Sequence, residues 1–191
     1  MKHILKLGLT LAIFASVSCF CLALVNHITA PVIEQRQADK ASSGMKTVFA
    51  DADSFEEVTD FKASAVPAIS IDKMYLAKKG GSVIGAVAQV TGPTYDRSTI
   101  IFGIKKDGVL TGMQFLASSD TAGFGLKASD PNYTVSSGKT FYGQFEGKNA
   151  KDGFVPGQTF EAVSGATITS KGVAELLTQG TQSALACLAA K

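Results

Sequence analysis

The sequence predicts an α+β fold in which one N-terminal transmembrane helix precedes an antiparallel-sheet domain with packed helices. Three observations predict it. A long uncharged apolar run lies near the N-terminus, two stretches with hairpin patterns follow in the middle of the chain, and apolar residues at helical spacing occupy the C-terminal end. Strands and helices do not alternate as βαβ units, which excludes a doubly wound parallel sheet.

Residues 7–25 form an apolar run of 19 residues without a charge. As a helix this run spans about 28 Å, close to the roughly 30 Å hydrocarbon core of a bilayer. A cleaved signal peptide is the alternative, because Lys2 and Lys6 supply the basic start of either. Signal peptides, however, have shorter apolar regions of about 7–15 residues. We therefore expect an uncleaved anchor that holds the chain in the lipid bilayer.

The charges around this run predict its orientation. Lys2 and Lys6 precede the run, whereas residues 26–31 contain no Lys or Arg. The positive-inside bias places the N-terminus in the cytoplasm of a bacterial cell and the rest of the chain on the extracytoplasmic side of the inner membrane. The expected organisation is an anchor over residues 1–25, a connector over 26–46 and an extracytoplasmic domain over 47–191.

The segments after the anchor differ in how clearly they are patterned. Residues 31–46 are polar and predict a helical connector. Residues 49–66 are weakly patterned, and their apolar residues Phe49, Phe55, Val58 and Phe61 lie at near-helical spacing.

The β-structure is clearer. Residues 69–77 and 82–90 flank Gly80 and Gly81 and predict a hairpin. Residues 98–105 and 109–116 flank the dipeptide Asp107-Gly108, which readily adopts the positive φ values of a tight turn, and they predict a second hairpin.

The last predicted element is a helix over residues 169–190, with apolar residues at helical spacing. Gly172 and Gly180 lower its intrinsic helix propensity. We therefore expect this helix to depend on packing for its stability.

Composition excludes several classes of function. The 191 residues are 46% hydrophobic, which is enough for a buried core. There are 18 basic and 16 acidic residues, and without Lys2 and Lys6 the charges balance. We therefore expect no nucleic-acid partner.

Histidine and cysteine usage narrows the chemistry further. The two histidines, His3 and His27, flank the apolar run, so the soluble part contains none. Catalysis by Ser-His-Asp or Cys-His groups and metal binding through histidine are excluded there. Cys19, Cys21 and Cys187 do not have the spacing of a metal site, and we expect no metal.

Residues 161–170, with the sequence Glu-Ala-Val-Ser-Gly-Ala-Thr-Ile-Thr-Ser, form the first of two segments that suggest a binding site. The segment contains four hydroxyls and a glycine just before the predicted C-terminal helix. A helix N-terminus presents unpaired N–H groups and suits a phosphate. Composition alone nevertheless favours the alternative that the hydroxyls only cap the helix.

Residues 120–126, with the sequence Asp-Thr-Ala-Gly-Phe-Gly-Leu, form the second segment. Gly123 and Gly125 surround an aromatic residue and would allow positive φ or a close backbone approach to a flat ligand. An ordinary turn is the alternative.

Together the two segments resemble one family. Residues 164–170 resemble the flavinylation motif of the FMN-binding domain, which occurs in the G subunit of the Rnf electron-transport complex and in the C subunit of the sodium-pumping NADH:quinone reductase. Residues 120–125 are similar to the Glu-Thr-Pro-Gly-Leu-Gly loop of that family, and residues 144–148 match a further segment. The chain differs from the family pattern in having Glu161 in place of Asp, Ala122 in place of Pro and Phe124 in place of Leu.

The resemblance implies that residues 47–191 hold FMN through a phosphoester on Thr167, attached by a separate FAD:protein FMN transferase. It implies one set of cofactor-binding residues from the two segments: Ser164, Gly165, Ala166, Thr167, Thr169, Ser170, Asp120, Thr121, Gly123, Phe124, Gly125 and Leu126.

The implied function is electron transfer within a membrane-bound, ion-translocating ferredoxin:NAD oxidoreductase of Rnf type. The implied partners are membrane subunits and subunits with Fe–S centres or a second flavin. The alternatives are the C-type subunit of the sodium-pumping quinone reductase, a stand-alone extracytoplasmic flavin carrier, and an anchored scaffold or binding domain without redox function.

Overall fold

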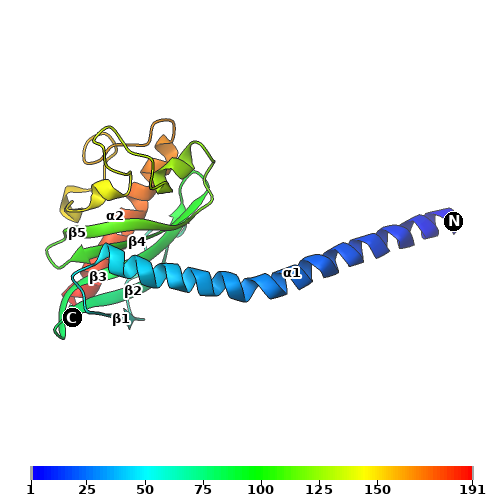
Figure 1. Cartoon of the computed structure of the whole chain (residues 1–191), viewed down its shortest axis with the longest axis horizontal. Coiled ribbons are helices and arrows are strands. Elements are labelled where there is room, and N and C mark those ends of the chain that lie inside the picture. The colour runs from blue at the N-terminus through cyan, green and yellow to red at the C-terminus, as the bar shows by residue number, and fades with distance from the viewer. Residues whose placement is uncertain (1, 191) are drawn as a thin grey trace. The chain divides into compact units, whose positions relative to one another are not determined.

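The computed structural model describes residues 2–190 and confirms the α+β prediction. In these residues two α-helices, α1 (Lys2–Val48) and α2 (Thr167–Ala189), accompany five strands in one sheet (Figure 1). The strands are β1 (Ser54–Val58), β2 (Ser70–Lys79), β3 (Ser82–Pro93), β4 (Arg97–Lys105) and β5 (Leu110–Ser118). Short 3₁₀ turns lie at Gly125–Ser129, Gly143–Phe145 and Ala150–Asp152. The chain divides into two compact units, residues 1–40 and 41–191.

The first unit contains a helix that is long and apolar enough to cross a membrane. Lys2–Ile33 comprises 32 residues with a mean hydropathy of 2.3, and none of its most apolar stretch is buried by the protein. The predicted N-terminal helix is thus confirmed. The helix continues past Pro31 to Val48, so the predicted helical connector is part of the same element.

The sheet is an antiparallel meander in the order β1-β2-β3-β4-β5. Both predicted hairpins are present. Gly80 and Gly81 turn the first at φ 56° and 82°. In the second, Gly108 has φ 92°, whereas Asp107 keeps a negative φ and its side chain accepts a hydrogen bond from the Val109 amide at 3.0 Å.

The helical spacing noted over residues 49–66 was misleading, because this segment contains β1. Phe55 packs in the cluster on one face of the sheet and Val58 in the cluster on the other. Residues three apart in a strand point to opposite faces. Two apolar residues that serve two different cores therefore imitate the spacing of a single helical face.

The two faces of the sheet are covered by different helices. The larger cluster includes Phe102, Val173 and Leu177 and lies between the sheet and α2. The smaller cluster contains Val48 and Phe49 at the end of α1 and residues of β2, β3 and β4. The last turns of α1, from Ala41 onward, thus belong to the second unit.

The glycines of α2 allow this helix to lie close to the sheet. A Cβ at Gly180 would come within 2.6 Å of the Phe102 ring, and one at Gly172 would come within 2.6 Å of the Thr94 Cα. Glycine at positions 172 and 180 therefore lowers the intrinsic stability of the helix but is required by its close packing on the sheet and the β3–β4 turn.

Strand register brings the parts of the site to one end of the sheet. Pro93 of β3 pairs with Arg97 of β4, and Ser98 of β4 pairs with Ser118 of β5. The β3–β4 turn and the end of β5 are therefore neighbours. The contact between Gly172 and the β3–β4 turn adds the start of α2 to them.

Candidate functional site

A cavity of about 470 Å³ brings the two sequence motifs together. Its volume lies within the range of about 300–1,000 Å³ that is usual for small-molecule and cofactor sites. It is lined by Thr121, Phe124 and Gly125 from the first motif, by Gly165, Ala166, Thr167, Ile168 and Thr169 from the second, and by Tyr95.

The N-terminus of α2 opens into this cavity. Thr167 is the first helical residue, and the first bond of the helix runs from the Ser170 amide to the Ala166 carbonyl at 3.0 Å. The amides of residues 167–169 precede that bond and have no partner within the helix. Among the described residues no side chain caps this terminus through Ala166, and no acidic residue lies in the first turn. The capping alternative is therefore not supported, and the arrangement suits an anion.

The hydroxyls of the second motif divide into two groups. Thr167 and Ser164 are exposed. Thr169 and Ser170 are buried: Thr169 donates to Asp120 Oδ2 at 2.6 Å, and Ser170 Oγ donates to the Ala166 carbonyl and accepts from the Val163 amide, both at 3.0 Å. Thr167 is thus an exposed hydroxyl that also lines the cavity, whereas Thr169 already donates its proton inside the protein.

The motif glycines have three different roles. Gly123 takes φ 78°, a turn conformation that glycine favours. Gly165 takes φ 76°, and a Cβ there would lie 3.4 Å from the Phe124 ring, so the two motifs touch. A Cβ at Gly125 would lie 2.6 Å from Thr169 Oγ1 and 2.7 Å from Asp120 Cβ. The close approach expected at Gly125 is therefore to the protein itself.

Asp120 does not line the cavity, but it accepts a hydrogen bond from Thr169, which does. The Asp120 side chain is 3% exposed. Oδ1 accepts hydrogen bonds from Thr94 Oγ1 at 2.7 Å and from the Asp96 amide at 2.9 Å. Burial raises the pKa of Asp120, but the hydrogen bonds from Thr169, Thr94 and the backbone at Asp96 and Tyr95 together lower the pKa below its ordinary value. The carboxyl is therefore ionised at neutral pH.

The other predicted site residues are placed around the cavity without lining it. The Leu126 amide donates to the Thr121 carbonyl at 3.2 Å, which closes the turn of the glycine loop, and the Leu126 side chain is half-buried. Gly123, Ser170 and Asp120 likewise shape the two loops, and Ser164 is exposed next to Gly165.

The sequence interpretation missed Tyr95 as a cavity residue. Tyr95 lies in the β3–β4 turn, lines the cavity and is 64% exposed. The one feature of the sequence that could have indicated Tyr95 is that it is an aromatic residue in a turn.

The role of Gln144 was also not foreseen, although it lies in the third matching segment. Gln144 is buried; its Nε2 donates to the Glu161 carbonyl at 2.9 Å, and its Oε1 accepts from the Glu161 amide at 2.7 Å. The backbone that enters the second motif is thereby fixed, and the Glu161 carboxylate takes no part in these two bonds.

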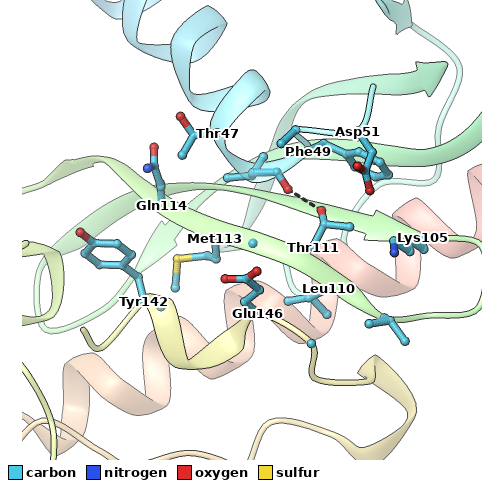
Figure 2. A pocket seen from close by; sticks show the side chains of 16 residues that line it. Thr47, Phe49, Asp51, Lys105, Leu110, Thr111, Met113, Gln114, Tyr142 and Glu146 are labelled. Carbon is cyan, nitrogen blue, oxygen red and sulfur yellow. Dashed lines mark hydrogen bonds between the residues drawn. The ribbon is translucent and has the colours of Figure 1, made fainter. Parts of the chain in front are cut away.

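A second cavity, of about 500 Å³, lies apart from both motifs (Figure 2). The end of α1, strand β5 and residues 142–147 surround it, and Thr111 donates a hydrogen bond to the Val48 carbonyl at its edge. Across residues 2–190 no group of three or more His, Cys, Asp or Glu side chains is arranged to hold a metal ion.

Comparison with known proteins gives two family matches. Residues 1–48 match the RnfG N-terminal region, and residues 94–182 match the FMN-binding domain.

Several known relatives cover most of the chain. The chain is 33% identical to the G subunit of the Na⁺-translocating ferredoxin:NAD⁺ oxidoreductase complex of Acetobacterium woodii, over 90% of this chain and 87% of that protein. It is 29% identical to the G subunit of the proton-translocating ferredoxin:NAD⁺ oxidoreductase complex of Clostridium ljungdahlii, over 85% of this chain and 82% of the relative. It is 28% identical to the G subunit of the ion-translocating oxidoreductase complex of Methanosarcina acetivorans, over 92% of both chains.

Proposed function

Because this chain belongs to the family of G subunits of ion-translocating ferredoxin:NAD⁺ oxidoreductase complexes, we propose that it relays electrons in such a complex through FMN esterified to Thr167. One observation carries the proposal: both motifs line a single cavity, and the exposed Thr167 begins α2 there. The relatives described above are G subunits, which favours the Rnf-type complex over the quinone reductase.

The residues present fit FMN. The amides at the start of α2 suit its phosphate, and the hydroxyl of Thr167 is beside them. Phe124, Ile168 and Tyr95 line the cavity and are each more than half exposed, so they offer apolar surface to a flat ring. FMN supplies the electron-carrying chemistry when bound, and the chain supplies attachment, orientation and electrostatics.

Attachment of the flavin requires a separate enzyme. Among the nine residues that line the cavity in the described part of the chain, none is His, Lys, Asp or Glu, so the weak Thr167 nucleophile has no base there. We propose that an FAD:protein FMN transferase performs the step. The Thr167 Oγ–phosphorus bond forms as the pyrophosphate bond of FAD breaks, AMP leaves, and the hydroxyl proton is released.

We further propose that the apolar run of α1, residues 7–25, crosses the membrane once, with the N-terminus in the cytoplasm and residues 47–191 on the extracytoplasmic side of the bacterial inner membrane. Lys2 and Lys6 before the span support this orientation. A covalent bond has an advantage on that side, because lost FMN is not readily replaced there. The partners are the membrane, Fe–S and flavin subunits of the complex.

In-gel fluorescence tests the attachment. The full chain is expressed together with the transferase and separated by denaturing electrophoresis, and its band should fluoresce under ultraviolet light. Thr167→Val should abolish the fluorescence, whereas the control Thr178→Val on the same helix should keep it. A fluorescent Thr167→Val band would refute Thr167 as the acceptor. A colourless, non-fluorescent wild type would favour the scaffold alternative.

Thiol labelling tests the orientation. Ser43 is exposed in the second unit, so Ser43→Cys in a background without the three native cysteines offers a single reactive thiol. A reagent that does not cross membranes should label it in spheroplasts. Labelling that occurs only after lysis would reverse the orientation, and a purified chain that begins near residue 26 would show that the apolar segment is a cleaved signal.

A further inference from the structure

The carboxylate of Asp120 joins three segments that line the cavity. Asp120 itself begins the glycine loop. Its Oδ1 holds the β3–β4 turn through Thr94 Oγ1 (2.7 Å) and the Asp96 amide (2.9 Å), and its Oδ2 holds the start of α2 through Thr169 Oγ1 (2.6 Å). These three side-chain and backbone donors thus converge on one buried anion.

Close packing around Asp120 holds these segments against one another. Gly125 and Gly172 each leave less than 3 Å for a Cβ, at the Asp120–Thr169 contact and at the β3–β4 turn respectively. A further hydroxyl chain continues beneath the turn, because Thr94 Oγ1 lies 3.0 Å from Ser98 Oγ, which donates to Ser118 Oγ at 3.0 Å. The turn is therefore held to the carboxylate through Thr94 and the Asp96 amide, next to a cluster of buried hydroxyls.

The β3–β4 turn carries Tyr95 into the cavity. The Tyr95 ring is 64% exposed although the turn that carries it is fixed through the amide of the next residue, Asp96, which donates to the Asp120 carboxylate. A large aromatic ring that stays exposed on a rigid turn, beside a cavity, is placed to contact a flat ligand.

We propose that Asp120 is a positioning residue that couples the β3–β4 turn to the first turn of α2, and that Tyr95 on this turn contacts the bound flavin ring. The second half of this proposal rests on the proposed function. The coupling means that a disturbance at Thr169 is transmitted to Tyr95 through the carboxylate, which accepts hydrogen bonds from both segments.

Carboxylate chemistry explains why an aspartate is used. An ionised carboxylate accepts hydrogen bonds at both oxygens and needs no donor partner. Hydrogen bonds to an ionised group are stronger than neutral ones. An asparagine would keep one acceptor oxygen but would turn an N–H group toward one of the two segments.

Hydrogen exchange of the unflavinylated full chain in detergent tests the coupling. Thr169→Val removes one hydroxyl from Asp120, and amide exchange in residues 94–96 should become about tenfold faster or more, as expected for losing a charge-assisted hydrogen bond. Thr94→Val should likewise accelerate exchange in the first turn of α2. Thr178→Val is the control, because Thr178 donates to the Ala174 carbonyl at 2.8 Å, further along the same helix. If each variant accelerates exchange only in its own segment, or Thr178→Val has the same effect, the coupling is refuted.

Flavin fluorescence of the loaded chain tests the contact with Tyr95. A phenol ring against a flavin quenches its emission, so Tyr95→Leu should raise the fluorescence yield. Thr169→Val should raise it less, and the double variant should match Tyr95→Leu alone. An unchanged yield in Tyr95→Leu, or full additivity of the two variants, overturns the proposal. A wild type that never acquires FMN defeats the proposed function, and the exchange experiment still decides the coupling.

Discussion

Replacing Gly172 with alanine is expected to destabilise the domain, although alanine is the better helix former. By propensity alone the substitution in the interior of α2 would gain about 1 kcal/mol. The new Cβ would, however, lie 2.6 Å from the Thr94 Cα and 2.8 Å from the Pro93 carbonyl oxygen. Both are backbone atoms, so no side-chain rotation relieves the contact. Overpacking of this kind costs about 1–3 kcal/mol, which leaves a net loss of roughly 1 kcal/mol.

Thermal unfolding of the full chain in detergent measures this loss. A net change of about 1 kcal/mol lowers the midpoint of a domain of this size by roughly 2–4 °C. Gly44→Ala on α1 is the matched control, since the nearest atoms that its Cβ would meet are side-chain methyl groups, Ile101 Cγ2 at 3.2 Å and Leu116 Cδ2 at 3.4 Å, and not backbone atoms. Its midpoint should equal or exceed that of the wild type, because the gain in helix propensity is not opposed by a backbone contact. A rise in the midpoint of Gly172→Ala would show that propensity outweighs the backbone contact and that the helix can move away from the β3–β4 turn.

Individual contacts give three further predictions. The pKa of Asp120 is lowered in the folded protein, so the ionised carboxylate stabilises the fold fully above the ordinary value of 3.8, and this stabilisation is lost as the pH falls through the lower folded-state pKa. In urea unfolding measured from neutral pH to about pH 3, Asp120→Asn should therefore show a smaller fall of the midpoint at acid pH than the wild type does. Gly103→Ala should lower the free energy of unfolding by about 1–3 kcal/mol in chemical denaturation, because its Cβ would lie 2.7 Å from the Val48 carbonyl; a neutral effect would contradict the tight packing of α1 on β4. Phe124→Ala should change stability by less than about 0.5 kcal/mol, since the ring is 58% exposed, yet it should shift the visible absorbance of the FMN-loaded chain; an identical spectrum would place the flavin elsewhere.

Features determined by short-range chemistry could be predicted from the sequence. The apolar N-terminal part of α1 follows from a run of 19 residues without a charge. The hairpin of β4 and β5 follows from Asp107-Gly108, and Gly108 takes the positive φ that this dipeptide predicts. The start of α2 follows from the second motif.

Features determined by contacts between distant residues could not be predicted. Strand β1 was obscured because Phe55 and Val58 serve cores on opposite faces of the sheet. Tyr95 carries no motif, and only the pairing of β3 with β4 places it beside residues 70 or more positions away. Gly125 was expected to approach a ligand, but it approaches Asp120 and Thr169.

The sequence by itself thus determined an N-terminal apolar helix, an antiparallel domain and two motifs that resemble an FMN-binding domain, because composition, spacing and turn chemistry are local properties. Only the tertiary structure decided how the motif residues divide their roles. The register of the meander and the close packing of α2 bury the Thr169 hydroxyl against Asp120 and leave that of Thr167 exposed at the cavity. Two threonines that are nearly equivalent in sequence become different in chemistry, because a buried carboxylate 49 residues away accepts a hydrogen bond from one of them.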